Sequence, residues 1–118
     1  MIKIYHNNRC SKSRSGLDIV KTSGKDFEIV KYLENPPTIN ELKDIIKMLG
    51  INPIDLVRKN ETIWKENFKG KNLSDDHIIK TMVENPKLIE RPIVINGNKA
   101  IVGRPPELIL NIISKTQC

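Results

Sequence analysis

Apolar and polar residues alternate at the start of the chain and then change to a helical spacing. Ile2 and Ile4 fall on one face of a short strand, and Asn7 and Asn8 favour a turn after it. From Leu17 onward apolar residues recur at the spacing of a helix. The pattern predicts a strand, a polar turn and a helix, in that order.

Residues 27–32 are rich in β-branched and aromatic side chains and follow the predicted helix. A crossover of about twenty residues that contains a helix joins parallel strands. The first third of the chain is therefore predicted to be a βαβ unit.

The middle of the chain is predicted to be helical. Thr38 and Glu41 have the spacing of a capping box and open a helix with one apolar face. A short helix is expected from Pro53, and another helix begins after Ser74. Residues 61–73 are polar and weakly patterned, which is typical of a loop or a frayed helix, and we expect Trp64 and Phe68 to anchor it.

The last third of the chain carries the strongest hairpin signal. Residues 92–95 and 99–102, which are apolar apart from Lys99, lie on either side of Asn96-Gly97, and this dipeptide accepts the positive φ of a two-residue turn. Pro105-Pro106 then opens a last helix. The element order becomes βαβ, a helical insert and ββα.

Length and composition restrict the classes of protein. A chain of 118 residues is long enough for one core, so we expect a single domain over residues 1–118. The net charge of +6 is compatible with anionic ligands, but the five aromatic residues and the scattered lysines disfavour a nucleic-acid-binding domain. With two cysteines and no apolar run that spans a bilayer, we expect a cytoplasmic protein with reduced thiols and no membrane association.

Cys10 lies where the first predicted helix begins. A helix N-terminus leaves N–H groups unpaired and carries partial positive charge, so it stabilises a thiolate and nearby anions. Arg14 is four residues further along the same helix face, and we expect it to contribute to anion binding. A buried structural cysteine is the alternative, which the neighbouring cations Arg9 and Lys12 disfavour. A reactive cysteine in this turn, with the element order above, predicts a thioredoxin-like α/β fold with a mixed sheet.

Three arginines lie at a helix end or directly before a proline. Arg58 ends the short helix of the insert, while Arg91 and Arg104 each precede a proline, which holds the backbone extended. A planar guanidinium suits a tetrahedral oxyanion. Each arginine taken by itself is also compatible with a surface position, and their spacing does not show that they converge on Cys10.

Metal and phosphatase chemistry find no support in the sequence. His6 and His77 lie far apart, and the two cysteines do not form a ligand pair at metal spacing. The Cys-x5-Arg signature of a phosphatase fails because position 16 is glycine. We expect no metal and no bound cofactor.

Five stretches carry specific motifs: Ile4–Asn7 with Cys10 and Ser13-Arg14, Tyr32–Pro37, Leu56–Asn60, Ile89–Val94 and Gly103–Pro105. On these stretches, which span almost the whole chain, the sequence resembles the glutaredoxin-dependent arsenate reductases. That family belongs to a wider thioredoxin-like group, which also holds small thiol reductases and a redox-responsive transcriptional regulator.

The resemblance implies a catalytic cysteine at Cys10 and an arginine triad at Arg58, Arg91 and Arg104 that holds arsenate and the departing arsenite. The family's conserved histidine near the cysteine falls on His6, and the cis-proline of the fold falls on Pro92. An ordinary histidine at a strand end remains the alternative for His6.

The resemblance also implies the reaction. The Cys10 thiolate attacks arsenate, glutathione as co-substrate attacks the adduct, and glutaredoxin removes the glutathione with release of arsenite. Ser13 stands where a Cys-x-x-Cys motif has its second thiol, which fits a reductant from outside. Cys118, the last residue, is expected on a mobile tail, with a resolving role as the alternative.

Two other functions stay open on the same fold. A glutathione-dependent thiol-disulfide reductase would need Cys10 but not three arginines. A redox-responsive regulator that binds RNA polymerase usually switches through Cys-x-x-Cys, which Ser13 interrupts. The sequence therefore favours arsenate reduction.

Overall fold

The computed structural model describes residues 1–113 and divides the chain into two compact units. Unit 1 is formed by Met1–Asn35 together with the chain from Arg91 onward, and unit 2 is formed by Pro36–Glu90. The single domain expected over residues 1–118 stays a prediction. Cys118 lies outside the described residues.

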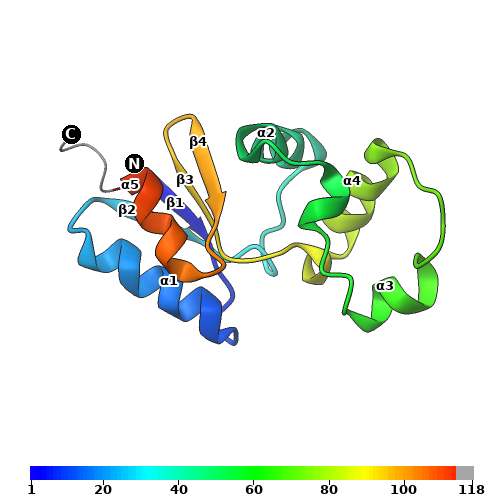
Figure 1. Ribbon diagram of the computed structural model, residues 1–118, viewed down its shortest axis with the longest axis horizontal. Coiled ribbons are helices and arrows are strands. Elements are labelled where there is room, and N and C mark those ends of the chain that lie inside the picture. The colour runs from blue at the N-terminus through cyan, green and yellow to red at the C-terminus, as the bar shows by residue number, and fades with distance from the viewer. Residues whose placement is uncertain (114–118) are drawn as a thin grey trace. The chain divides into compact units, whose positions relative to one another are not determined.

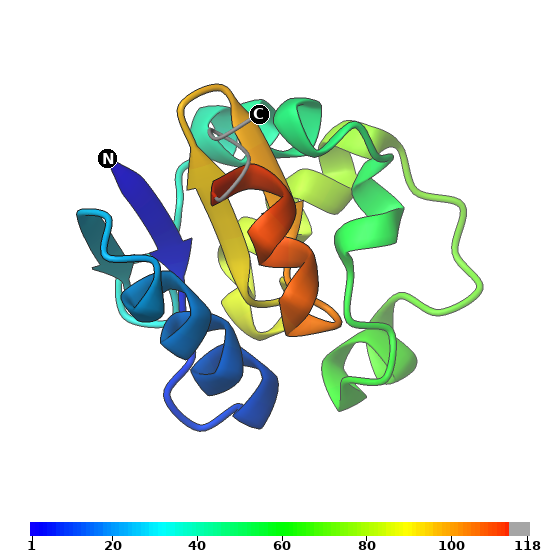
Figure 2. The ribbon, with the colours of Figure 1, turned by 60° about the vertical axis from the view of Figure 1, so that its left-hand side comes forward.

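Unit 1 contains a mixed four-stranded sheet, as predicted. Its strands are β1 (Ile2–Tyr5), β2 (Phe27–Val30), β3 (Ile93–Asn96) and β4 (Lys99–Val102). The order is β2-β1-β3-β4, so β1 lies between β2 and β3 (Figures 1 and 2). β2 runs parallel to β1, whereas β1 and β3, and likewise β3 and β4, are antiparallel. The βαβ and hairpin predictions are both confirmed.

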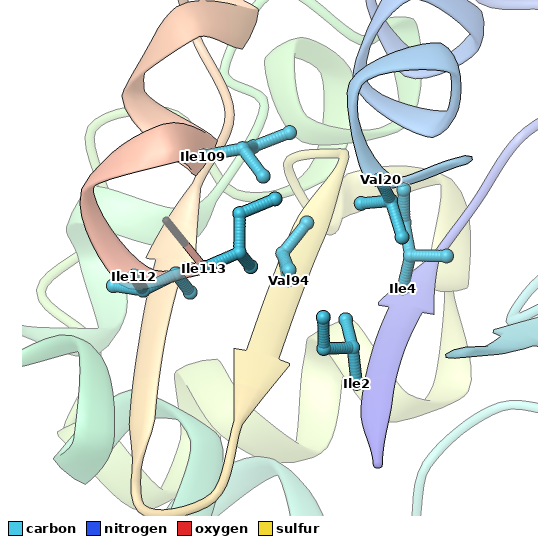
Figure 3. Packing of buried hydrophobic residues seen from close by; sticks show 7 residues of the cluster. All are labelled: Ile2, Ile4, Val20, Val94, Ile109, Ile112 and Ile113. Atoms are coloured by element: carbon cyan, nitrogen blue, oxygen red, sulfur yellow. The ribbon is translucent and has the colours of Figure 1, made fainter. Parts of the chain in front are cut away.

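One face of this sheet is covered by α1 (Ser11–Thr22), the 3-10 helix η3 (Pro106–Ile109) and α5 (Leu110–Ile113). The alternation in β1 turns two isoleucines into the core, where Val20 of α1 meets them because its helix face is apolar. Figure 3 shows the resulting cluster, which consists of Ile2, Ile4, Val20, Val94, Ile109, Ile112 and Ile113.

The hairpin turn lies one residue further along than predicted. Asn96 pairs with Lys99, so the two loop residues are Gly97 and Asn98 rather than Asn96 and Gly97. Gly97 has φ +66°, and no residue other than glycine has a positive φ among residues 1–113. A two-residue turn with glycine first needs only one positive φ, which explains the shift.

Unit 2 is helical, as predicted. Its helices are α2 (Ile39–Leu49), the 3-10 helix η1 (Pro53–Leu56), α3 (Thr62–Asn67), α4 (Asp75–Glu84) and the 3-10 helix η2 (Pro86–Leu88). The predicted capping box is present: Thr38 Oγ1 accepts the N–H of Glu41, and the Glu41 carboxylate accepts the N–H of Thr38.

Two helical predictions need correction, and the structure decides between the alternatives of a third. Residues 61–73, predicted as a loop or a frayed helix, contain the short helix α3, which Trp64 anchors, since its ring is buried and stacks on Phe68 with centroids 5.5 Å apart. The helix expected from Pro53 is a single 3-10 turn. The last helix begins as the 3-10 turn η3 and becomes α-helical only at Leu110.

Candidate functional site

Cys10 is the N-cap residue of α1, as predicted. Its backbone is extended, with φ −97° and ψ 123°, and its N–H donates to the carbonyl of Asn7 over 3.1 Å. Its own carbonyl accepts the N–H of Arg14 at 3.0 Å and so begins the helical hydrogen-bond ladder. The residue is 9% exposed and is a free cysteine. Turn and helix together place the thiol at the positive end of α1.

Ser13 ties the first turn of α1 to the loop before Cys10. Its hydroxyl lies 2.7 Å from Nδ1 of His6 and accepts the N–H of Asn7 at 3.0 Å. Both His6 and Ser13 are buried. The sequence shows Ser13 only as the missing second thiol of a Cys-x-x-Cys motif. This hydrogen bonding role was missed, because it joins residues seven positions apart across a turn.

The environment of His6 favours its neutral form. Burial is the main effect and lowers the pKa of His6 below its ordinary value of 6.5. The positive charges of Arg14 and Lys21 lower it further, while hydrogen bonds with Asn8 and Ser13 raise it in part. An uncharged imidazole is consistent with its buried hydrogen bond to Ser13.

Arg14 reaches back to the loop that precedes Cys10. Its Nη1 donates to the carbonyl of Asn8 at 2.9 Å, and the side chain is exposed. On the other side of the loop, the N–H of Arg9 donates to the side chain of Asn7 at 3.0 Å. The hydrogen bond from Arg14 therefore stabilises this loop. That Arg14 contributes to anion binding stays a prediction.

Arg91 and Arg104 meet in unit 1. Nη1 of Arg104 donates to the backbone carbonyl of Arg91 at 3.1 Å. Arg91 is buried and Arg104 is exposed. The Arg91–Pro92 peptide bond is cis, as the resemblance implies, and Arg104–Pro105 is a second cis bond that was not predicted.

The helix that carries Cys10 packs directly against the segments of these two arginines. A Cβ at Gly16 of α1 would lie only 2.9 Å from Cγ of Pro92, and a Cβ at Gly103 would lie 3.1 Å from the same atom. The N–H of Gly103 donates to the carbonyl of Pro92 at 2.9 Å. Pro92 and Gly103, the neighbours of Arg91 and Arg104, are thus joined to each other and to α1.

Arg58 belongs to unit 2, where it lies two residues beyond η1. Its Nη1 donates to Oε2 of Glu61 at 2.5 Å, and its Nε lies 3.6 Å from Oε1 of Glu90. The sequence shows the i, i+3 spacing of Arg58 and Glu61 but not the approach of Glu90. That Arg58, Arg91 and Arg104 converge on Cys10 stays a prediction.

Within residues 1–113 no group of three or more His, Cys, Asp or Glu side chains is placed to hold a metal ion. In the same part of the chain, every helix is too short or too polar to cross a membrane. Unit 1 therefore carries a thiol, a buried imidazole and two arginines that contact each other. Such groups suit nucleophilic sulfur chemistry on an anion.

Three known proteins illustrate what the chain is similar to. The protein of Escherichia coli K12 called "Uncharacterized protein YfgD" is 48% identical over 114 residues, which cover 95% of this chain and 96% of that protein. An arsenate reductase of Neisseria meningitidis serogroup A is 44% identical over 110 residues, which cover 92% and 94%. The solved structure of an arsenate reductase from Vibrio cholerae matches with a TM-score of 0.89 at 44% identity and covers 94% and 96%.

The match to the Vibrio cholerae structure confirms the thioredoxin-like fold with its mixed sheet and helices. The sequence pattern of the ArsC family matches residues 5–112, a span that contains Cys10 and the three arginines. Relatives and family pattern agree over nearly the whole chain. This chain belongs to the ArsC family.

Proposed function

We propose that this protein is an oxidoreductase that reduces arsenate to arsenite with Cys10 as the nucleophile. The observation that carries the proposal is the position of Cys10 at the start of α1, a helix that packs through Gly16 on Pro92 beside Arg91. Relatives that are named arsenate reductases support the choice of substrate. A thiol at the positive end of a helix is suited to attack an oxyanion, and the proposal adds arginines that bind the oxygens.

In the first step, the Cys10 thiolate attacks arsenic and a sulfur–arsenic bond forms. One arsenate oxygen takes up a proton and leaves as hydroxide or water, and arsenic remains pentavalent. Arg91 and Arg104 neutralise the oxygens, and Arg58 completes the triad. Arg14 adds positive charge beside the loop.

The two electrons of the reduction come from two external thiols. Glutathione displaces a second oxygen from arsenic, which leaves as water. A glutaredoxin thiolate then attacks the glutathione sulfur, so that a disulfide forms between them and the electron pair of the broken bond stays on arsenic. Hydrolysis of the remaining sulfur–arsenic bond releases arsenite and restores the Cys10 thiol. Ser13 cannot form an internal disulfide with Cys10, which fits this route.

His6 and Ser13 act on the loop rather than on the substrate. The Ser13 hydroxyl joins His6 to the N–H of Asn7 and so holds the loop that delivers Cys10. As part of the same proposal, the protein works in the cytoplasm, where glutathione keeps thiols reduced.

The test measures oxidation of NADPH on addition of arsenate, in the presence of glutathione, glutaredoxin and glutathione reductase. We expect arsenate-dependent oxidation with the wild-type protein and none with Cys10→Ser, because serine is a far weaker nucleophile than a thiolate. Cys118→Ser removes the other cysteine and is the matched control, for which we expect full activity.

Activity that survives Cys10→Ser would exclude the proposed nucleophile. Oxidation of NADPH that needs a disulfide substrate but not arsenate would instead identify a thiol-disulfide reductase.

A further inference from the structure

Arg58 is held between two carboxylates. Its Nη1 donates to Oε2 of Glu61 at 2.5 Å, and its Nε is 3.6 Å from Oε1 of Glu90. The three side chains are 24%, 28% and 27% exposed, so the cluster is largely shielded from water. Nothing in the proposed reaction uses either carboxylate.

The backbone fixes this arrangement. Val57 and Ile89 form an antiparallel bridge, and the N–H of Arg58 donates to the carbonyl of Leu88 at 2.7 Å. Residues on either side of such a bridge point to the same face, so Arg58 and Glu90 are diagonal neighbours.

Glu61 is brought to Arg58 by the turn that leads into α3. In this turn the N–H of Glu61 donates to the carbonyl of Arg58 at 3.1 Å. Both carboxylates therefore approach Arg58 because of local backbone hydrogen bonds, and they form a cluster rather than a chance surface contact.

The carboxylates compete with any oxyanion for Arg58. A guanidinium binds an oxyanion through two parallel N–H groups. It can present two such pairs: one pair includes Nε, and the other is formed by the two terminal nitrogens. Glu90 faces Nε, and Glu61 takes a terminal nitrogen. One positive charge also faces two negative charges, so an approaching oxyanion is repelled.

We propose that Glu61 determines oxyanion affinity by occupying Arg58 as an internal anion, which arsenate must displace. The inference rests on the proposed function, since that function assigns Arg58 to the substrate. It goes further because it predicts a residue whose change improves binding. Glu61→Gln keeps the size of the side chain and removes the competing charge. Glu61 caps α3 without a side-chain hydrogen bond, so this substitution removes no cap.

The test is a calorimetric titration of arsenate into the protein in a Cys10→Ser background, where no adduct forms. Addition of Glu61→Gln is expected to lower the dissociation constant about threefold to tenfold, which is the range for loss of one partly shielded ion pair and one repulsive charge. Glu66→Gln is the matched control, because Glu66 is an exposed glutamate of α3. The control is expected to bind arsenate as the parent does.

A second readout follows Arg58 itself. Phenylglyoxal modifies accessible arginines, and peptide mass spectrometry gives the rate at each one. We expect Glu61→Gln, but not Glu66→Gln, to speed the modification of Arg58, and arsenate to slow it. Equal affinity in both variants, absence of binding, or an unchanged rate at Arg58 would overturn the inference.

The two proposals fail in different experiments. If arsenate causes oxidation of NADPH but Glu61→Gln has no effect on arsenate binding, the proposed function is supported and this inference is wrong. If Glu61→Gln tightens arsenate binding but the protein never reduces arsenate, this inference is supported and the proposed function is wrong.

Discussion

His6 makes the stability of the protein sensitive to pH. Burial holds the pKa of the folded-state imidazole below 6.5, whereas the unfolded chain has the ordinary value. Between these two pKa values the unfolded state binds the extra proton, so the free energy of unfolding falls as the pH drops below 6.5. The contribution of one histidine to this slope is at most about 1.4 kcal/mol per pH unit.

His6→Asn is expected to flatten this dependence, since an amide does not titrate but keeps a polar atom near Ser13. The measurement is urea unfolding between about pH 5.5 and about pH 7.5, roughly one unit to either side of the ordinary histidine pKa, compared with wild type at each pH. His77→Gln is the control, because His77 is the other histidine and is exposed. If wild type and His6→Asn have equal slopes, the buried neutral imidazole is the wrong description.

At the same scale, sequence patterns placed the candidate site residues better than their contacts. Cys10 was found because turn residues and a helical spacing meet there. The partners of Arg58 were missed, because Glu90 reaches it only through the bridge between Val57 and Ile89. Sequence patterns within a few residues do not predict such a long-range pairing.

Among the elements, α1 is positioned by the absence of a side chain at Gly16. A Cβ there would lie 2.9 Å from Cγ of Pro92 and 3.0 Å from Cδ1 of Ile109. The proline ring is rigid and Ile109 is fully buried, so neither neighbour yields easily. The close packing of α1 on Pro92 therefore depends on glycine at this position.

Gly16→Ala is expected to lower the free energy of unfolding by about 1–2 kcal/mol, because overcrowding of the core outweighs the better helix propensity of alanine. Urea unfolding gives this value. Ser15→Ala, an exposed position on the same helix, is the control and should leave the stability unchanged or slightly raised. A stabilised Gly16→Ala protein would mean that α1 is free to shift away from Pro92.

For the whole molecule, the division into two units raises the question of cooperativity. Unit 2 is inserted between β2 and β3, and both its ends continue into unit 1. Each unit is small and buries a limited core, so we expect neither to be stable by itself. The single domain predicted from the sequence then unfolds as one unit.

Two local probes test this expectation in a Cys118→Ser background. Trp64, the single tryptophan, reports on unit 2 by its fluorescence, and pulsed labelling of the Cys10 thiol reports on unit 1. The urea midpoints from both probes are expected to coincide. Two separate midpoints would show that the units unfold independently and that the single-domain prediction is wrong.

The sequence by itself determined the secondary structure order, the helical insert, the hairpin and the place of Cys10 at a helix start. These features depend on periodicity, capping and turn preferences within a few residues. The one-residue shift of the hairpin turn and the helix α3 mark the limit of such patterns, since a short segment leaves the exact turn, and the choice between a loop and a short helix, undecided.

Only the tertiary structure decided which groups contact one another. The hydrogen bond from Arg104 to Arg91, the contact of Gly16 with Pro92 and the approach of Glu90 to Arg58 join residues from distant segments of the chain. The physical reason is that strand pairing and core packing bring these segments together, and the resulting contacts depend on the fold as a whole.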